Sequence, residues 1–137
     1  MSVKQIEVVA AIITHQNRYL CVRRGESYLD YISKKWEFPG GKIEQDETRT
    51  SALTREIREE LEMNIGNLEY FTTVTHTYPD FKLTMHAYLC TSIEQDPTLS
   101  EHIDFKWLPK EELSSIDWAA ADIPIVHKIV NDQDRLT

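Results

Sequence analysis

An acid-rich segment, TREIREELEM at residues 54–63, most constrains what this chain can fold into, because four glutamates and two arginines fill its ten positions. Apolar residues recur every four positions through this stretch, which is the spacing of one face of a helix. They are Leu53, Ile57 and Leu61. The pattern therefore predicts a helix over residues 48–63 that buries this stripe in a core.

Three glutamates fall on one flank of the predicted helix, beside its apolar stripe, at about 100° of rotation per residue. They are Glu56, Glu59 and Glu60. Neither Arg55 nor Arg58 falls within that flank, and like charges at these spacings repel by roughly 0.2–0.5 kcal/mol per pair. Two interpretations stay open. The acids form a solvated face, as Arg58 and Glu62 do, or they hold a hard cation such as Mg²⁺ or Mn²⁺.

The rest of the chain predicts one mixed α/β domain over residues 1–137, with strands first, a central helix and a terminal helix. Apolar, β-branched runs at residues 6–15 and 18–24 predict two antiparallel strands joined by a short turn. Residues 25–35 predict a loop, and WEFPGG at residues 36–41 predicts a short strand that leads into an ordered turn. The later predicted elements are two long strands within residues 64–94 that turn at 78–81, a strand at 105–108 and an amphipathic helix at 123–133.

Composition excludes several classes of partner. A net charge of −8 argues against binding a nucleic-acid backbone, which lysine and arginine drive. No apolar run approaches the roughly 20 residues that a membrane span needs, and no cleavage site of a secretory signal follows the N-terminus. We therefore expect a cytoplasmic protein without a nucleic-acid or membrane partner. Cys21 and Cys90 lie in apolar strand-like runs, which predicts buried thiols.

Residues 41–63 resemble the Nudix box, in which glycine is followed after five residues by glutamate, and after seven more by R-E-U-x-E-E-x-G-U with U apolar. The matching positions are Gly41, Glu47, Arg55, Glu56, Ile57, Glu59, Glu60 and Met63. Glu62 stands where the box has glycine, a residue that commonly ends a helix in the left-handed conformation. We expect Asn64 or Gly66 to end the helix instead, and activity to be retained.

Segments outside the box extend the resemblance to the MutT-like branch, and within it to CTP pyrophosphohydrolase-type members. They are IEVVAAII, WEFPGGKIE, HTYPD and ADIPIV. The resemblance implies the α/β class and the Nudix fold, an α/β/α sandwich with a mixed sheet between helices. It also implies an enzyme that hydrolyses a nucleoside triphosphate to the monophosphate and pyrophosphate with Mg²⁺, for which Mn²⁺ can substitute. We expect a small-molecule nucleotide as the partner and a monomer or homodimer.

By resemblance, glutamates of the predicted helix, a later glutamate and one backbone carbonyl hold the cation. The expected ligands are Glu56, Glu59, Glu60, Glu101 and the Gly40 carbonyl. Glu56 is the expected general base and Glu101 its rival, since metal-bound water needs only a nearby carboxylate. Without the resemblance, a solvated loop position explains Glu101 as well as a metal-binding or catalytic role does. Glu47 and Arg55 are expected to form an ion pair that holds the loop with Gly41 against the helix.

Four residues are expected at the nucleotide, and three have a structural alternative. Arg24 suits phosphate or base oxygens, or simply ends its strand at the surface. Phe38 forms a wall of the base pocket or part of the core, and Asp80 contributes with Phe81 from a turn. Asp122 suits the exocyclic amine of cytosine, because an ionised carboxylate only accepts hydrogen bonds, or it caps the last helix.

Two alternative functions stay open. The guanine-sanitising MutT enzyme has asparagine at the place of Asp122, but other oxidised-purine hydrolases use aspartates there, so 8-oxo-dGTP or a similar damaged purine nucleotide is the alternative substrate. A Nudix domain that senses a nucleotide without cleaving it is the alternative of another class. Such domains typically lose box acids, and this chain keeps them.

Overall fold

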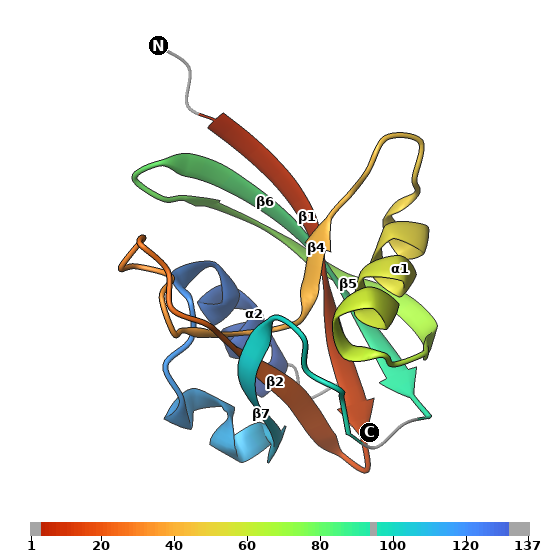
Figure 1. The fold of residues 1–137 in the computed structure, drawn as a ribbon. Helices are drawn as coiled ribbons and strands as arrows, with labels where there is room; N and C mark the ends of the chain where they lie inside the picture. The colour runs from red at the N-terminus through yellow and green to blue at the C-terminus, as the bar shows by residue number, and fades with distance from the viewer. Residues whose placement is uncertain (1–3, 94–95, 132–137) are drawn as a thin grey trace.

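A computed structural model describes residues 4–93 and 96–131 as one sheet with a helix on either side (Figure 1). The strands are β1 Lys4–His15, β2 Arg18–Arg24, β3 Trp36–Glu37, β4 Gly40–Lys42, β5 Ile65–Thr77, β6 Phe81–Ser92 and β7 His102–Pro109. The helices are α1 Arg49–Leu61 and α2 Ile123–Asn131, with short 3-10 helices η1 at Lys110–Ser115 and η2 at Ala120–Asp122.

Strand β1 is the centre of the sheet, whose strand order is β3-β2-β1-β6-β5. β6 runs parallel to β1, whereas the other strand pairs are antiparallel, so the sheet is mixed as predicted. β4 pairs with β1 from Val8 to Ala10, while β2 pairs with the end of β1 at Thr14 and His15. β4 thus takes the place of β2 beside the first half of β1 and brings the Gly-Gly segment next to α1.

The two faces of the sheet bury separate cores. On β1, Val9, Ala11 and Ile13 pack in the core that contains α1, whereas Ala10 and Ile12 pack in the core that contains α2. This alternation follows from the two-residue period of a strand. The predicted apolar stripe of α1 is completely buried. The fold is therefore the α/β/α sandwich that the sequence predicts.

The predicted elements are found close to their expected bounds, with one exception. The sequence predicts only a turn after Trp36–Glu37, and this is wrong for Gly40–Lys42, which forms β4. A Cβ atom at residue 40 would overlap the carbonyl oxygen of Val9, so glycine permits the close approach of β4 to β1. Residues 94, 132 and 133 of the predicted elements lie outside the described residues.

Helix α1 ends in a way that the sequence did not predict. It begins at Thr48, whose hydroxyl accepts a hydrogen bond from the Ser51 N–H at 3.1 Å. It ends at Glu62, which adopts the left-handed conformation (φ 54°, ψ 39°) and donates its N–H to the Arg58 carbonyl. Neither Asn64 nor Gly66 has a positive φ, so the expectation that one of them ends the helix is wrong.

Both cysteines are buried free thiols, as predicted. Burial raises the pKa of Cys21 and of Cys90 to about 12, which keeps each thiol protonated and unreactive. Across residues 4–93 and 96–131, no helix has the length and apolar character needed to cross a membrane.

Candidate active site

A cavity of about 940 Å³ lies between the Gly-Gly segment of β4, helix α1 and the segment that leads into α2. Nine residues that the sequence singled out line it: Arg24, Phe38, Gly40, Gly41, Glu56, Glu60, Phe81, Glu101 and Asp122. A second cavity, of about 1110 Å³, is lined by the β1–β2 turn and the ends of β5 and β6 and by none of the predicted site residues. The tertiary structure thus gathers predicted residues from six separate stretches of the chain in one place.

Glycine makes room where the cavity meets α1. A Cβ atom on Gly41 would overlap the carboxylate of Glu56, so the absence of a side chain there lets Glu56 lie directly beneath the β4 backbone. The side chain of Glu56 is only 15% exposed. The box glycine therefore has a steric reason, which is to make room for the first glutamate of α1.

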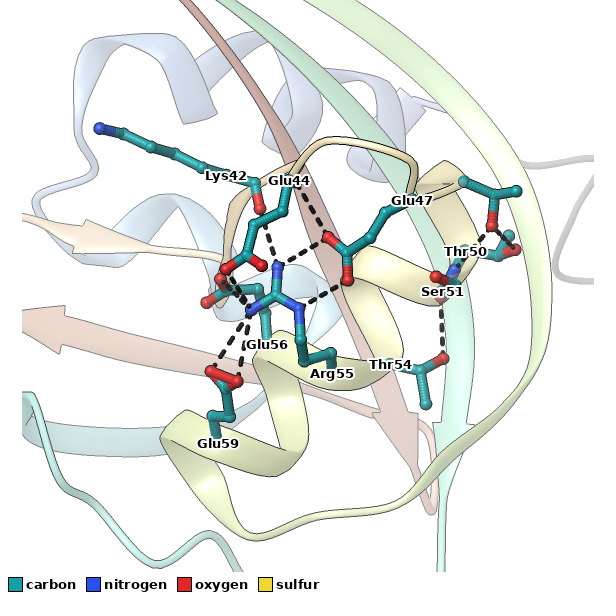
Figure 2. Close-up of polar contacts among 10 residues, drawn as sticks. Lys42, Glu44, Glu47, Thr50, Ser51, Thr54, Arg55, Glu56 and Glu59 are labelled. Atoms are coloured by element: carbon teal, nitrogen blue, oxygen red, sulfur yellow. Dashed lines mark hydrogen bonds and ion pairs between the residues drawn. The ribbon is translucent and has the colours of Figure 1, made fainter.

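Arg55 is the centre of a dense polar network on the outer side of α1 (Figure 2). Its Nε donates to Glu47 at 2.7 Å and its Nη2 donates to Glu47 at 2.9 Å and to the Lys42 carbonyl at 3.1 Å. Its Nη1 donates to Glu56 at 2.9 Å and contacts Glu59 at 3.3 Å. The ion pair expected between Glu47 and Arg55 is present, and it ties the loop after β4 to the helix.

The network corrects the expectation that Arg55 lies outside the acidic flank. The helical wheel places Cβ atoms only, whereas the long arginine side chain reaches the neighbouring acids at the next turn. The hydrogen bonds from Arg55 lower the pKa of Glu47 to about 2, so this carboxylate is ionised at neutral pH. The exposed carboxylate of Glu59 lies against Arg55 and not in the cavity lining.

Glu60 has the opposite environment on the inner side of the same helix. Burial, followed by the charges of Glu56 and Glu101, raises its pKa to about 9. Its Oε2 atom is buried and has no hydrogen-bond partner among the described residues. A carboxyl group of this kind costs stability unless a ligand compensates it.

The wall opposite α1 contains residues that the sequence did not single out. The Glu37 carboxylate contacts Arg24 Nη1 at 3.3 Å and His102 Nε2 at 2.9 Å. The Tyr78 hydroxyl accepts a hydrogen bond from the Ala121 N–H at 3.0 Å, which leaves its own proton available. Glu37 lies inside the WEFPGG segment and His102 follows Glu101, so their places beside two predicted site segments are the only signal that the sequence gives for them.

Asp122 is buried, with 4% of its surface exposed. Its Oδ1 accepts a hydrogen bond at 3.0 Å from the N–H of Phe38, which follows β3, and not from the first turn of α2, so this oxygen does not cap the helix. Burial, and then the charge of Glu37, raises the pKa of Asp122 well above its usual range. Phe38 is itself 3% exposed and stacks on Trp118, so it is a core residue that also lines the cavity.

Asp80 does not line the cavity. Its carboxylate accepts a hydrogen bond from the Tyr31 hydroxyl at 2.5 Å, and Tyr31 stacks on Tyr78 with ring centroids 5.1 Å apart. This contact holds the loop after β2 against the β5–β6 turn. Asp80 therefore holds Tyr31, which in turn packs on the cavity residue Tyr78. The expected contact of Asp80 with the nucleotide stays a prediction.

The NUDIX domain model matches residues 8–128. The chain belongs to the Nudix family. A CTP pyrophosphohydrolase of Escherichia coli is 35% identical over 90% of this chain and 90% of its own length. An 8-oxo-dGTP diphosphatase of the same organism is 28% identical over 92% of this chain and 97% of its own length.

A solved structure of a MutT protein of the Nudix hydrolase family, from methicillin-resistant Staphylococcus aureus, is 41% identical and superposes with a TM-score of 0.71 over 96% of this chain and 99% of its own. The chain is thus a MutT-like Nudix hydrolase, an enzyme that acts on the phosphoanhydride of a nucleotide. The family and the α/β fold with a mixed sheet that the sequence predicts are confirmed.

The donor set in the cavity of this Nudix hydrolase fits a hard divalent cation. Seven carboxylates line it against two basic side chains, Arg24 and Lys42. The acids are Glu26, Glu37, Glu44, Glu56, Glu60, Glu101 and Asp122. Within the described residues, no three of the potential ligands already converge on one point. The Oε2 of Glu60 is an oxygen donor that no group of the described part of the chain satisfies, which is the kind of atom that Mg²⁺ takes.

Proposed function

We propose that this protein is a Mg²⁺-dependent nucleoside triphosphate pyrophosphohydrolase that converts CTP, dCTP or 5-methyl-dCTP to the monophosphate and pyrophosphate. The observation that carries the proposal is the excess of acidic groups in the cavity, where seven acidic side chains face two basic ones. Burial favours the protonated form of two of them, Glu60 and Asp122, and the other five still outnumber the basic groups. A triphosphate would be repelled from such a lining. Divalent cations bound between the phosphate oxygens and the carboxylate oxygens would remove this repulsion. The buried Oε2 of Glu60 supplies one oxygen ligand for them.

The proposal assigns a role to each expected ligand and to Arg24. Glu56, Glu60 and Glu101, with the Gly40 carbonyl, hold the cation, and Glu59 joins them by turning away from Arg55. When bound, Mg²⁺ neutralises the phosphate charge and lowers the pKa of a ligated water. Arg24 binds phosphate or base oxygens with its guanidinium fork.

The general base is Glu56, with Glu101 as the rival. Glu56 lies below Gly41 and is bonded to Arg55, an arrangement that fixes its carboxylate toward the cavity. Glu101 lines the same cavity, and its charge is one of the causes that raise the pKa of Glu60, so the two carboxyl groups lie near each other. Glu101→Gln and Glu56→Gln, compared by the pH dependence of kcat, separate the two: loss of the acidic limb identifies the base.

The choice of cytosine rests on Asp122 and on the similarity to the CTP pyrophosphohydrolase. One oxygen of Asp122 is used by the Phe38 N–H, so the other is available to accept from the exocyclic amine of cytosine. The test is kcat/KM for CTP, 5-methyl-dCTP and 8-oxo-dGTP with Mg²⁺. Release of pyrophosphate from none of a wider nucleotide panel with Mg²⁺ or Mn²⁺ would contradict the whole proposal.

A specific observation favours a second substrate, 8-oxo-dGTP. The burial that raises the pKa of Asp122 favours the protonated carboxyl, which can donate as well as accept, as asparagine does. Such a group suits an oxidised guanine as well as cytosine, and 8-oxo-dGTP diphosphatases are among the relatives. Asp122→Asn distinguishes the cases: it lowers kcat/KM for CTP relative to 8-oxo-dGTP if the ionised form reads the base, and leaves the ratio unchanged if the protonated form does.

A nucleotide sensor without turnover is the proposal of another class. The complete set of box acids and the Arg55 network favour the enzyme. Calorimetry that finds tight CTP or 8-oxo-dGTP binding with no product after long incubation would favour the sensor.

A further inference from the structure

A chain of three side chains crosses the cavity wall opposite α1. His102, the first residue of β7, contacts Glu37 of β3 at 2.9 Å through Nε2, and Glu37 contacts Arg24 at the end of β2 at 3.3 Å. The side chain of His102 is 6% exposed, that of Glu37 is 20% exposed and that of Arg24 is 42% exposed. The chain therefore runs from a buried ring to a guanidinium that the nucleotide can reach.

His102 is only half satisfied. Its Nδ1 is buried and has no hydrogen-bond partner among the described residues, while its Nε2 bonds Glu37. A buried nitrogen that has lost its water and found no protein partner lowers stability. Of the described side-chain atoms, only this nitrogen and Glu60 Oε2 are buried and unpartnered, and both residues line the same cavity. The imidazole is thus held at this place at a cost to stability.

A second histidine shows what a purely structural imidazole looks like in this fold. His86 is also buried, and its Nε2 contacts the Glu7 carboxylate at 2.6 Å. Its Nδ1, however, is bonded to the Thr73 hydroxyl at 2.9 Å, and neither His86 nor Glu7 lines the cavity. Both histidines thus contact a glutamate through Nε2. They differ in that the Nδ1 of His86 has a hydrogen-bond partner and that, of the two, only His102 lines the cavity.

We propose that His102 is a positioning residue for nucleotide binding, which holds the Glu37 carboxylate so that Glu37 in turn aims Arg24 into the cavity. This inference rests on the proposed function of the cavity as a nucleotide site. The Glu37 carboxylate contacts His102 at 2.9 Å and Arg24 at 3.3 Å, so loss of the His102 contact would leave only the longer one to hold it. Without the hydrogen bond from His102, the carboxylate would turn toward water and Arg24 would follow it or swing out. His102 does not need to touch the nucleotide for this role.

The experiment compares wild type with His102→Phe, which keeps a ring of similar size but cannot bond Glu37. We expect KM for the preferred triphosphate to rise about tenfold with kcat within about threefold, because the lost interaction orients the nucleotide equally in the ground and transition states. The Kd of CMP and of 8-oxo-dGMP, measured by calorimetry in metal-free buffer and with Mg²⁺, should rise by a similar factor for the nucleotide that binds.

His102→Gln places an amide N–H near the former Nε2 position and should bring KM to within about threefold of wild type. A double-mutant cycle with Glu37→Ala tests the route: once Glu37 is gone, His102→Phe should change KM by less than about twofold. His86→Phe is the matched control. It removes a buried histidine–glutamate contact outside the cavity, so it should lower the Tm and leave KM and both Kd values unchanged.

Several outcomes would overturn the inference. These are an unchanged KM and Kd in a folded His102→Phe variant, an equal effect of His102→Phe with and without Glu37, or an equal rise of KM in His86→Phe. If His102→Phe does not fold, the comparison of His102→Gln with His102→Asn decides, because asparagine is too short to reach Glu37. The proposed function can fail separately: no turnover of any nucleotide would refute it, while a His102-dependent Kd for a monophosphate would still support the positioning role.

Discussion

The outer and inner sides of helix α1 each have a glutamate beside them, Glu47 from the preceding loop and Glu60 from the helix itself, in opposite electrostatic states. On the outer side, Arg55 bonds Glu47, and the pKa of that carboxyl is lowered to about 2. On the inner side, Glu60 is buried near Glu56 and Glu101, and its pKa is raised to about 9. Arg55 neutralises Glu47 on the side of the loop after β4. Glu60 points to the cavity on the other side of the helix and has no such partner within residues 4–93 and 96–131.

The opposite pKa shifts distinguish acids that stabilise the fold from acids that are suited to bind a ligand. A carboxylate with an arginine fork has its lone pairs satisfied by the protein and stabilises the loop. A buried carboxyl with an unpartnered oxygen destabilises the protein until a cation arrives. Glu56 belongs to both sets, since it bonds Arg55 and lines the cavity. It connects the structural network to the site.

The largest effect should come from Glu60→Gln, which removes the ionisable carboxyl group on the inner side. We expect activity with Mg²⁺ to fall at least about 100-fold, because a buried ligand oxygen is replaced by a neutral amide. The Tm in metal-free buffer should rise, since the amide is easier to bury beside two carboxylates than an acid that ionises. Pyrophosphate release and differential scanning calorimetry measure the two effects.

Glu59→Gln is the companion variant, because Glu59 is an expected ligand that lies outside the cavity lining. If its carboxylate joins the cation on binding, activity should fall by about 10- to 100-fold while the metal-free Tm stays nearly unchanged. Activity close to that of wild type would remove Glu59 from the ligand set and leave it as a partner of Arg55 alone.

The next largest effect should be on stability, from Arg55→Lys on the outer side. Lysine cannot make the fork that bonds both oxygens of Glu47 and also reaches Glu56. We expect the Tm to fall by about 5 °C or more, because the carboxylates that Arg55 now bonds would lose hydrogen bonds and repel one another. Lys35→Met is the control, since the Lys35–Asp117 pair at 2.8 Å is largely exposed on its acid side and should contribute little.

The pH dependence of stability should have opposite signs for the two acids. The pKa of Glu60 is raised, so the unfolded state loses a proton that the folded state keeps between about pH 4.5 and pH 9. The free energy of unfolding of metal-free protein should therefore decrease as pH rises through this window, and Glu60→Gln should remove that decrease. Saturating Mg²⁺ should also reduce it, because the cation binds the ionised form.

Glu47 has a lowered pKa, so its contribution is present above about pH 4.5 and is lost as pH falls toward 2. Glu47→Gln should thus lower the Tm at pH 7, and the difference from wild type should shrink as the solution is acidified. Thermal unfolding from pH 2.5 to pH 9 measures both acids. The same sign for Glu47→Gln and Glu60→Gln at pH 7 would contradict the comparison.

The smallest effect should come from the end of α1, where Glu62 replaces the box glycine. A left-handed residue with a side chain costs roughly 1–2 kcal/mol, partly offset by the entropy that glycine loses on folding. Glu62→Gly should therefore raise the free energy of unfolding by about 0.5–1 kcal/mol, with activity unchanged. Asn64→Gly, at a position without positive φ, should give no such gain.

Local sequence patterns predicted the elements well. The stripe of three apolar residues in α1 and the β-branched runs of β1 and β2 depend only on near neighbours in the chain, so their spacing is visible in the sequence. β4 could not be predicted in this way, since Gly40–Lys42 becomes a strand only because β1 lies beside it. The end of α1 was missed for a related reason, because glutamate seldom adopts the conformation that Glu62 takes.

The sequence by itself determined the family, the box acids and the apolar faces, because these depend on residue type and spacing along one helix or strand. Only the tertiary structure decided what each acid does. Glu47 and Glu60 differ because Arg55 reaches one and the cavity encloses the other. Glu37 and His102 are distant in sequence and meet at 2.9 Å only when β3 and β7 flank β2. Charge state and hydrogen bonding are set by what surrounds a side chain, and folding supplies those surroundings.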